Sequence, residues 1–145
     1  MNFYKHFIGD YGRDTGDLTL AEHGAYRVML DHFYGTSRPL PFEKKALYRL
    51  VRAESELEKR AVDRVSIRFW RQIPVEFTLL SGLLDLTTDE TQRPLKCVMQ
   101  EWDDEHGLIN LRALGEIVKA HVQGEKNRVI ALNREQAKRA RGGKL

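Results

Sequence analysis

Four arginines recur at helical spacing in the second quarter of the chain, and a row of guanidinium groups is well suited to binding phosphates. They are Arg60, Arg64, Arg68 and Arg71. Side chains at steps of four, four and three residues lie on one face of a helix, so the spacing predicts that all four project together. The nearby acids, Glu56 and Asp63, are too few to pair with every arginine. The pattern therefore favours a polyanion-binding surface over the alternative, a solvated helix face neutralised by its own acids.

Lysines and arginines elsewhere divide the chain into blocks of alternating charge. Residues 44–71 contain nine Lys/Arg against four Asp/Glu, and residues 123–145 contain seven against two, so each block carries a net charge of +5. Residues 1–43 and 72–122 carry net charges of −2 and −5. This distribution indicates a positive face on a protein whose total charge is only +3. The further residues expected to contact phosphates are Lys44, Lys45, Arg49, Lys126, Arg128, Lys138, Arg139 and Arg141.

The sequence contains no recognisable motif of an enzyme or of a metal site. It lacks a Gly-rich phosphate loop, a dinucleotide-binding glycine pattern and an HExxH pair. The five histidines are scattered, and a single cysteine, Cys97, can form neither an internal disulfide nor a zinc finger. We interpret the acidic run Asp103–Glu105 as an exposed turn, because adjacent acids rarely converge on a cation without further ligands. We expect no catalytic residues, no metal and no cofactor.

A central helix predicted over Leu18–Tyr34 organises the rest of the chain. Thr19 and Glu22 have the spacing of a capping box, in which each side chain accepts a hydrogen bond from a backbone N–H at the start of a helix. Apolar residues follow on a wide arc, so we expect this helix to lie in the core and to end near Gly35. Residues 1–17 contain three glycines, and we interpret them as an irregular arm whose aromatic rings pack over the helix.

Two helices are predicted to carry the first basic block. One runs from Phe42 to about Val51, and the other begins at a second capping box, formed by Ser55 and Glu58. The second helix runs to about Arg71 and therefore includes the whole arginine row. Its apolar residues recur every four positions and mark the side that faces the core.

The second half of the chain is predicted to form a short helix over Pro94–Trp102, a β-hairpin and a closing helix. The hairpin is expected to join Glu101-Trp102 to Leu108–Leu111 through the acidic turn. The closing helix begins near Arg112, and residues 123–145 extend it as a basic helix or tail whose KRARGGK end is expected to be disordered.

This order of elements predicts a mainly α fold with a small β-hairpin, of the winged-helix variant of the helix-turn-helix class. In that class the third helix enters the major groove of DNA. We expect one domain over residues 1–122 with an unusual insertion at about 72–96, followed by the basic extension 123–145.

The N-terminal motifs IGDY, LTLAEHGAYRVMLDHFY and RPLP resemble the phage-associated family of unknown function typified by the prophage protein YdaU. The resemblance covers residues 1–71 well and 101–145 moderately. Members of that family lack the roughly 25 residues over 72–96, which leaves two assignments of the recognition helix: the helix with the arginine row, or the helix at 94–102. Since family members often accompany replication-initiation and helicase-loading modules, the resemblance implies an accessory role in DNA replication.

Two functions are therefore open at this point. The first is a DNA-binding accessory protein that acts in replication initiation or its regulation. The second is an adaptor or inhibitor that binds a replicative helicase, a helicase loader or another host protein through residues 72–122. The sequence has no apolar run long enough to cross a membrane, and one cysteine suits a reducing compartment, so we expect a cytoplasmic protein.

Overall fold

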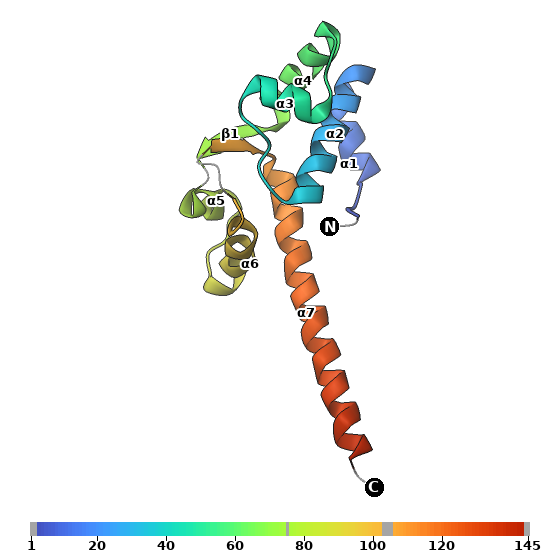
Figure 1. Ribbon diagram of the computed structural model, residues 1–145, viewed down its shortest axis with the longest axis vertical. Coiled ribbons are helices and arrows are strands. Elements are labelled where there is room, and N and C mark those ends of the chain that lie inside the picture. The colour runs from blue at the N-terminus through green and yellow to red at the C-terminus, as the bar shows by residue number, and fades with distance from the viewer. Residues whose placement is uncertain (1–2, 75, 103–105, 144–145) are drawn as a thin grey trace.

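The computed structural model describes residues 3–74, 76–102 and 106–143, and these residues are mainly helical with a small antiparallel sheet. The molecule is elongated (Figure 1). The first four helices lie at one end, and the last helix runs from this group along the long axis toward the C-terminus. The elements are α1 (Ile8–Thr15), α2 (Leu20–Thr36), α3 (Lys44–Val51), α4 (Glu56–Phe69), β1 (Arg71–Pro74), α5 (Phe77–Leu83), α6 (Asp89–Met99), β2 (His106–Ile109) and α7 (Leu111–Gly142).

Helix α2 is the predicted central helix, and its capping box is confirmed. The Thr19 side chain accepts from the Glu22 backbone N–H, and the Glu22 carboxylate accepts from the Thr19 backbone N–H. Met29 and Phe33 are fully buried. The helix ends one residue beyond Gly35, where Ser37 takes a left-handed conformation with φ 54° and donates its backbone N–H to the Phe33 carbonyl.

The prediction of an irregular N-terminal arm is wrong for residues 8–15, which form helix α1. Glycine weakens an isolated helix by about 1 kcal/mol, and contacts with the rest of the protein outweigh this cost here. The packing of aromatic rings over α2 is confirmed for two tyrosines. Tyr4 stacks on Tyr34 with ring centroids 4.0 Å apart, and Tyr11 stacks on Tyr26 at 5.9 Å.

The sheet joins segments that lie far apart in the chain. Strand β1 pairs with β2 in antiparallel register, with Arg71 opposite Ile109, and Leu40 forms a bridge to Leu108 on the other side of β2. The predicted hairpin from Glu101-Trp102 is therefore wrong, because β2 pairs with β1, the strand that follows α4. The acidic turn 103–105 lies outside the described residues.

Glycine at position 107 allows the close approach between β2 and the Leu40 segment. A Cβ atom at Gly107 would lie 2.4 Å from the Pro39 Cβ, a distance at which the backbone would have to move. Leu40 and Leu108 exchange backbone hydrogen bonds at 3.0 and 2.9 Å beside this contact. The bridge therefore depends on the absence of a side chain at this position.

Helices α5 and α6 lie between the two strands in the chain, in the segment expected to be an insertion. Helix α6 begins at Asp89, five residues before the predicted start, because Thr88 and Thr91 form a capping box there. It packs on α7, and Leu95 is fully buried. Beyond α6, the Trp102 Nε1 donates to the Ser37 carbonyl oxygen at 2.7 Å, which ties the end of the insertion to the end of α2.

Helix α7 continues without a break from Leu111 to Gly142, a length of about 48 Å at 1.5 Å per residue. The expected domain boundary at residue 122 falls within it. The expectation of a disordered end is wrong for residues 138–142, which are helical, while residues 144 and 145 lie outside the described ranges. Only the first part of α7, around Leu114 and Ile117, is buried, and its second half projects from the body (Figure 1).

Candidate nucleic-acid interface

Arg64 holds a buried carboxylate. Its Nη1 lies 2.7 Å from the Glu22 Oε1, and the Glu22 side chain is only 4% exposed. A carboxylate removed from water is costly unless a cation and hydrogen bonds satisfy it, and Arg64 and the Thr19 backbone N–H do so here. Arg64 therefore fixes α4 against the start of α2.

Arg68 is held in a similar way by the turn before α2. Its Nη1 donates to both oxygens of Asp17 at 2.8 and 2.7 Å, and its Nη2 donates to the Asp14 carbonyl oxygen at 2.9 Å. The guanidinium also lies over the Phe69 ring, 4.9 Å from its centroid. Hydrogen bonding from Arg68 lowers the pKa of Asp17 below its ordinary value, so this pair is fully charged at neutral pH.

The prediction that the arginine row lacks acids is wrong for Arg64 and Arg68. Their partners were not found because they come from distant residues; Asp17 precedes Arg68 by 51 residues. The prediction of one shared helix face is also wrong for Arg71, because α4 ends at Phe69 and Arg71 begins strand β1. Arg60 is exposed and has no ion-pair partner among the described residues.

Helix α3 presents a second group of exposed cations. Lys45 and Arg49 are exposed one turn apart on α3, and the exposed Arg52 follows at its C-terminal end. In the described part of the chain these three have no ion-pair partner, whereas Lys44 lies 3.6 Å from Asp63 on α4. The outward side of α3 is therefore positively charged.

Asp63 on α4 also binds a second residue of α3. The Tyr48 hydroxyl donates to Asp63, and this hydrogen bond raises the pKa of Tyr48 to about 12. Arg52 ends α3 in a left-handed conformation with φ 59°, and Ser55 caps α4 by accepting from the Glu58 backbone N–H. The two helices are thus joined rigidly through a short turn.

The predicted C-terminal cations line the projecting half of α7, which we define as residues 123–142. All of them are exposed, and Arg139 pairs with Glu135 at 2.6 Å, one helical turn away. For the other basic residues of this half, no ion pair occurs within the described ranges. They are Lys126, Arg128, Arg134, Lys138 and Arg141.

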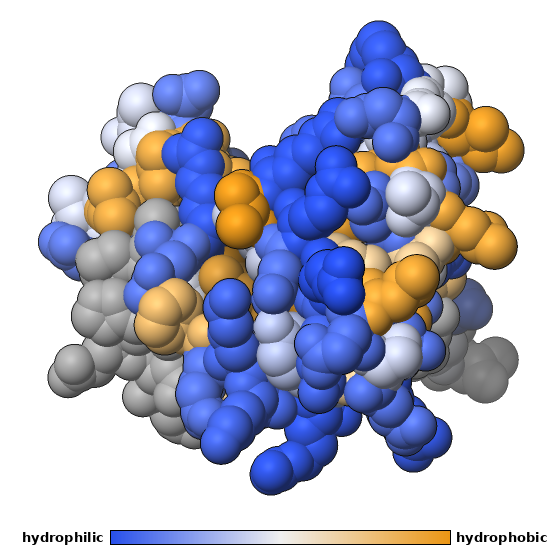
Figure 2. All heavy atoms as spheres, turned by 90° about the horizontal axis from the view of Figure 1, so that it is seen from above, coloured by the Kyte–Doolittle hydropathy of each residue, from blue (hydrophilic) through white to orange (hydrophobic). Residues whose placement is uncertain are grey.

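The structure does not bring the two basic groups together. The helices α3 and α4 lie at one end of the long axis, and the last residues of α7 lie at the other (Figure 1). Figure 2 looks down on the end that carries α3 and α4, where hydrophilic residues cover most of the surface and apolar side chains occur in separate groups. The expected single positive face is therefore two separate basic surfaces.

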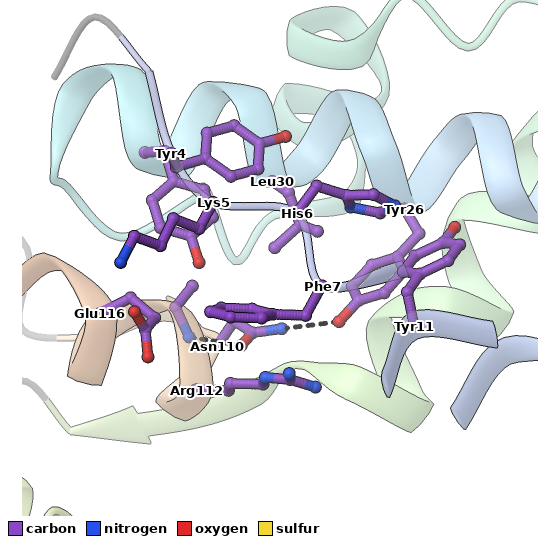
Figure 3. A pocket seen from close by; sticks show the side chains of 12 residues that line it. Tyr4, Lys5, His6, Phe7, Tyr11, Tyr26, Leu30, Asn110, Arg112 and Glu116 are labelled. Atoms are coloured by element: carbon purple, nitrogen blue, oxygen red, sulfur yellow. Dashed lines mark hydrogen bonds between the residues drawn. The ribbon is translucent and has the colours of Figure 1, made fainter. Parts of the chain in front are cut away.

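A hollow beneath the N-terminal arm gathers aromatic and charged side chains at the start of α7 (Figure 3). Asn110 is buried, and its Nδ2 donates to the Tyr26 hydroxyl at 3.3 Å. Arg112 pairs with Asp10 at 3.0 Å and with Asp14 at 3.4 Å, which fastens α1 to α7. Only ≈ 50 Å³ of space remains in this hollow, about the volume of one or two waters, so it is a packed contact.

The histidine, cysteine and acidic side chains are the possible metal ligands or reactive groups. Within the described ranges, no three His, Cys, Asp or Glu side chains are grouped to hold a metal ion. His23 is engaged in a hydrogen bond with the Tyr11 hydroxyl at 2.8 Å. Cys97 is half-buried on α6. None of the helices in the described part of the chain combines the length and hydropathy needed to cross a bilayer.

Sequence reasoning missed Arg112 and the acids of α1 that it binds. Asp10 and Asp14 are four residues apart and would have indicated one acidic helix face, had residues 8–15 been predicted as a helix. The glycines of this segment lower its helix propensity, so a helix was not predicted there.

Comparison with known proteins identifies one family. A sequence model described as "Protein of unknown function (DUF1376)" matches residues 2–74, which run from the N-terminal arm through β1. No curated protein and no solved structure matches the chain.

Proposed function

The chain belongs to the DUF1376 family, to which no function is assigned, and from this premise we propose that it is a phage-type DNA-binding accessory protein. Its role would lie in replication initiation or in its regulation. The phage and replication parts of this proposal rest on the resemblance of the N-terminal motifs. The DNA-binding part rests on the arrangement of elements and charges described above.

The observation that carries the proposal is the order in which helices and strands join. Helix α2, the Leu40 bridge, α3, α4 and β1 follow one another, β2 comes after α5 and α6, and in space β2 lies between Leu40 and β1. We propose to interpret this order as a variant of the winged-helix order, in which the third helix of the group is the recognition helix. Helix α4 would take that position, and the insertion α5–α6 would replace the wing between the strands. The alternative recognition helix at 94–102 belongs to that insertion.

The exposed charges of α3 and α4 suit the phosphate backbone of a duplex. Lys45 and Arg49 on α3 and Arg60 on α4 are exposed and without ion-pair partners among the described residues, so they can bind phosphates without breaking an existing contact. Lys44 would add a contact if it exchanged Asp63 for a phosphate. Arg64 and Arg68 are expected to contribute less to this surface, because Arg64 already pairs with Glu22 through its Nη1 and Arg68 with Asp17.

The projecting half of α7 would supply the second contact. The major groove of B-DNA is about 12 Å wide and accommodates an α-helix, and a phosphate backbone also attracts a basic helix laid along it. Since an isolated helix of this length is only marginally stable in water, binding along a polyanion would also stabilise it.

The experiment is a salt titration of binding to a labelled duplex, followed by fluorescence anisotropy. About seven phosphate contacts predict a log–log slope of about −6. Arg49→Glu with Arg60→Glu should abolish binding near physiological salt, because two contacts become repulsive. The matched control is Arg38→Glu with Arg93→Glu, which changes the charge equally on residues outside α3, α4 and the projecting half of α7. Equal losses in the two variants, with both proteins folded, would refute the proposed surface.

One observation favours the adaptor as a second candidate. Leu79 and Leu83 lie one turn apart on α5 and are 37% and 38% exposed, so the insertion presents a small apolar strip. This strip would bind a replicative helicase, a helicase loader or another host protein. Leu79→Glu with Leu83→Glu should then remove binding to that partner while DNA binding is retained; retained partner binding would exclude the strip.

A further inference from the structure

A second and larger hollow lies next to the one in Figure 3 and shares Tyr11, Tyr26, Asn110 and Arg112 with it. It has a volume of ≈ 370 Å³, within the range of small-ligand sites. It lies between α1, the end of α4, the start of β1 and the start of α7. We propose that this hollow binds a nucleoside phosphate, either as a free nucleotide or as the phosphorylated end of a nucleic-acid strand. We call it the three-arginine hollow, after Arg68, Arg71 and Arg112 in its wall.

Arg71 and Arg112 give the hollow its preference for an anion, while Arg68 in its wall is already bound to Asp17. Arg71 is exposed and has no ion-pair partner within the described ranges, so all its donors are available. Arg112 meets Asp14 at only 3.4 Å, a weak contact that a phosphate oxygen can replace. Planar guanidinium groups bind phosphates in pairs of parallel hydrogen bonds, and two or three of them around one cavity are typical of phosphate recognition.

An aromatic wall gives the hollow a place for a base. Tyr26 stacks on Phe69 with centroids 4.5 Å apart and an interplanar angle of 17°, and Tyr11 also stacks on Tyr26, with centroids 5.9 Å apart. Asn110 fixes this wall, because its Nδ2 donates to both the Tyr26 hydroxyl and the Phe69 carbonyl oxygen. Aromatic side chains beside cations are the usual means of binding a base and its phosphate without sequence preference.

Asp14 competes with the ligand in this arrangement. It lies in the wall of the hollow and shares Arg112 with Asp10. An incoming phosphate must displace it or lie beside it, so neutralising Asp14 should strengthen binding. If the arginines serve only to fasten α1 to the body, neutralising Asp14 will instead leave anion binding absent.

Calorimetric titration of the full chain with thymidine 5′-monophosphate, thymidine and inorganic phosphate tests the proposal. We expect the nucleotide to bind more tightly than either fragment. Arg71→Gln should weaken it by about tenfold or more, since one charge-assisted contact is lost. Asp14→Asn should strengthen it. The matched control Arg93→Gln, on α6, should change nothing. Because Arg71 makes no ion pair in the described structure, its variant should unfold at the wild-type denaturant midpoint.

Three results would overturn the proposal: no binding of the nucleotide, equal binding of inorganic phosphate alone, or an unchanged affinity in Arg71→Gln. Oligothymidylates with and without a 5′ phosphate separate the two ligand sources. Preference for the phosphorylated strand assigns the site to strand ends, and binding of the free nucleotide alone assigns it to nucleotides. Arg49 and Arg60 do not line the hollow, so Arg49→Glu with Arg60→Glu should leave nucleotide binding intact even if it abolishes duplex binding.

Discussion

The end of α4 and the projecting half of α7 carry their cations in opposite surroundings. At the end of α4, Arg64 and Arg68 bind Glu22 and Asp17, and both pairs have N–O distances of 2.7 Å. On α7, the ion pair between Glu135 and Arg139 is local, and the other cations are exposed. The same residue type therefore holds the fold together in one region and remains available to a partner in the other.

This difference shows that a row of basic residues in a sequence does not by itself tell whether those side chains are free to bind a partner. What decides it is whether acids from another segment reach the row after folding. Asp17 in the turn before α2 and Glu22 on α2 reach α4, while the end of α7 extends away from the rest of the protein (Figure 1). Substitutions in the two regions test how far this comparison holds.

The largest effect is expected from neutralising the projecting half of α7. Glutamine retains good helix propensity, so the helix should survive the change. Duplex affinity at 0.15 M salt should fall about hundredfold, and the log–log salt slope should shrink by about 4, because up to five phosphate contacts disappear. The residues to replace together are Lys126, Arg128, Arg134, Lys138 and Arg141.

Arg68→Gln is the matched control for this variant. Since Arg68 is already bound to Asp17, its loss should leave the salt slope nearly unchanged, whereas the loss of one phosphate contact would change it by about 0.9. A change of about 0.9 would show that the ion pair on α4 does not limit phosphate binding, and the comparison would fail.

A smaller effect, on stability, is expected from Arg64→Met. The change leaves the buried Glu22 carboxylate without its cation, which should lower the free energy of unfolding by about 2 kcal/mol. Urea denaturation followed by circular dichroism measures it. Arg60→Met, one turn earlier on α4, should change the free energy by less than about 0.5 kcal/mol because Arg60 is exposed and unpaired within the described structure.

Adding Glu22→Gln to Arg64→Met sharpens this prediction. Glutamine still accepts the Thr19 N–H but carries no charge, so the double variant should recover part of the loss. A double variant less stable than Arg64→Met would mean that the buried charge is not the cause.

The smallest effect is expected in acid and concerns Arg68. The pKa of Asp17 is lowered in the folded protein, so the ion pair contributes stability above the unfolded-state pKa of about 3.9 and loses it as the pH falls through the lower folded value. Arg68→Gln removes this contribution at neutral pH. Its stability relative to the wild type should therefore be lower at pH 7 and approach the wild-type value below about pH 3. A constant difference across this range would contradict the assignment.

Local interactions determined much of the helical structure from the sequence alone. The capping residues Thr19 and Ser55 and the apolar periodicity that follows them place α2 and α4 to within a few residues. Such signals act within four positions along the chain, so no knowledge of the fold is needed to interpret them. The family match over residues 2–74 covers the same segment.

The tertiary structure alone decided which strands pair and which arginines are paired. Helices α5 and α6 separate β2 from its partner β1 in the sequence. The acids that bind Arg64 and Arg68 lie more than 40 residues before them in the sequence. Helix α1 and its contact with Arg112 were likewise hidden, because glycine lowers the local helix propensity. Caps and periodicity depend on neighbours in sequence, whereas strand pairing and ion pairing depend on distances that exist only once the chain has closed on itself.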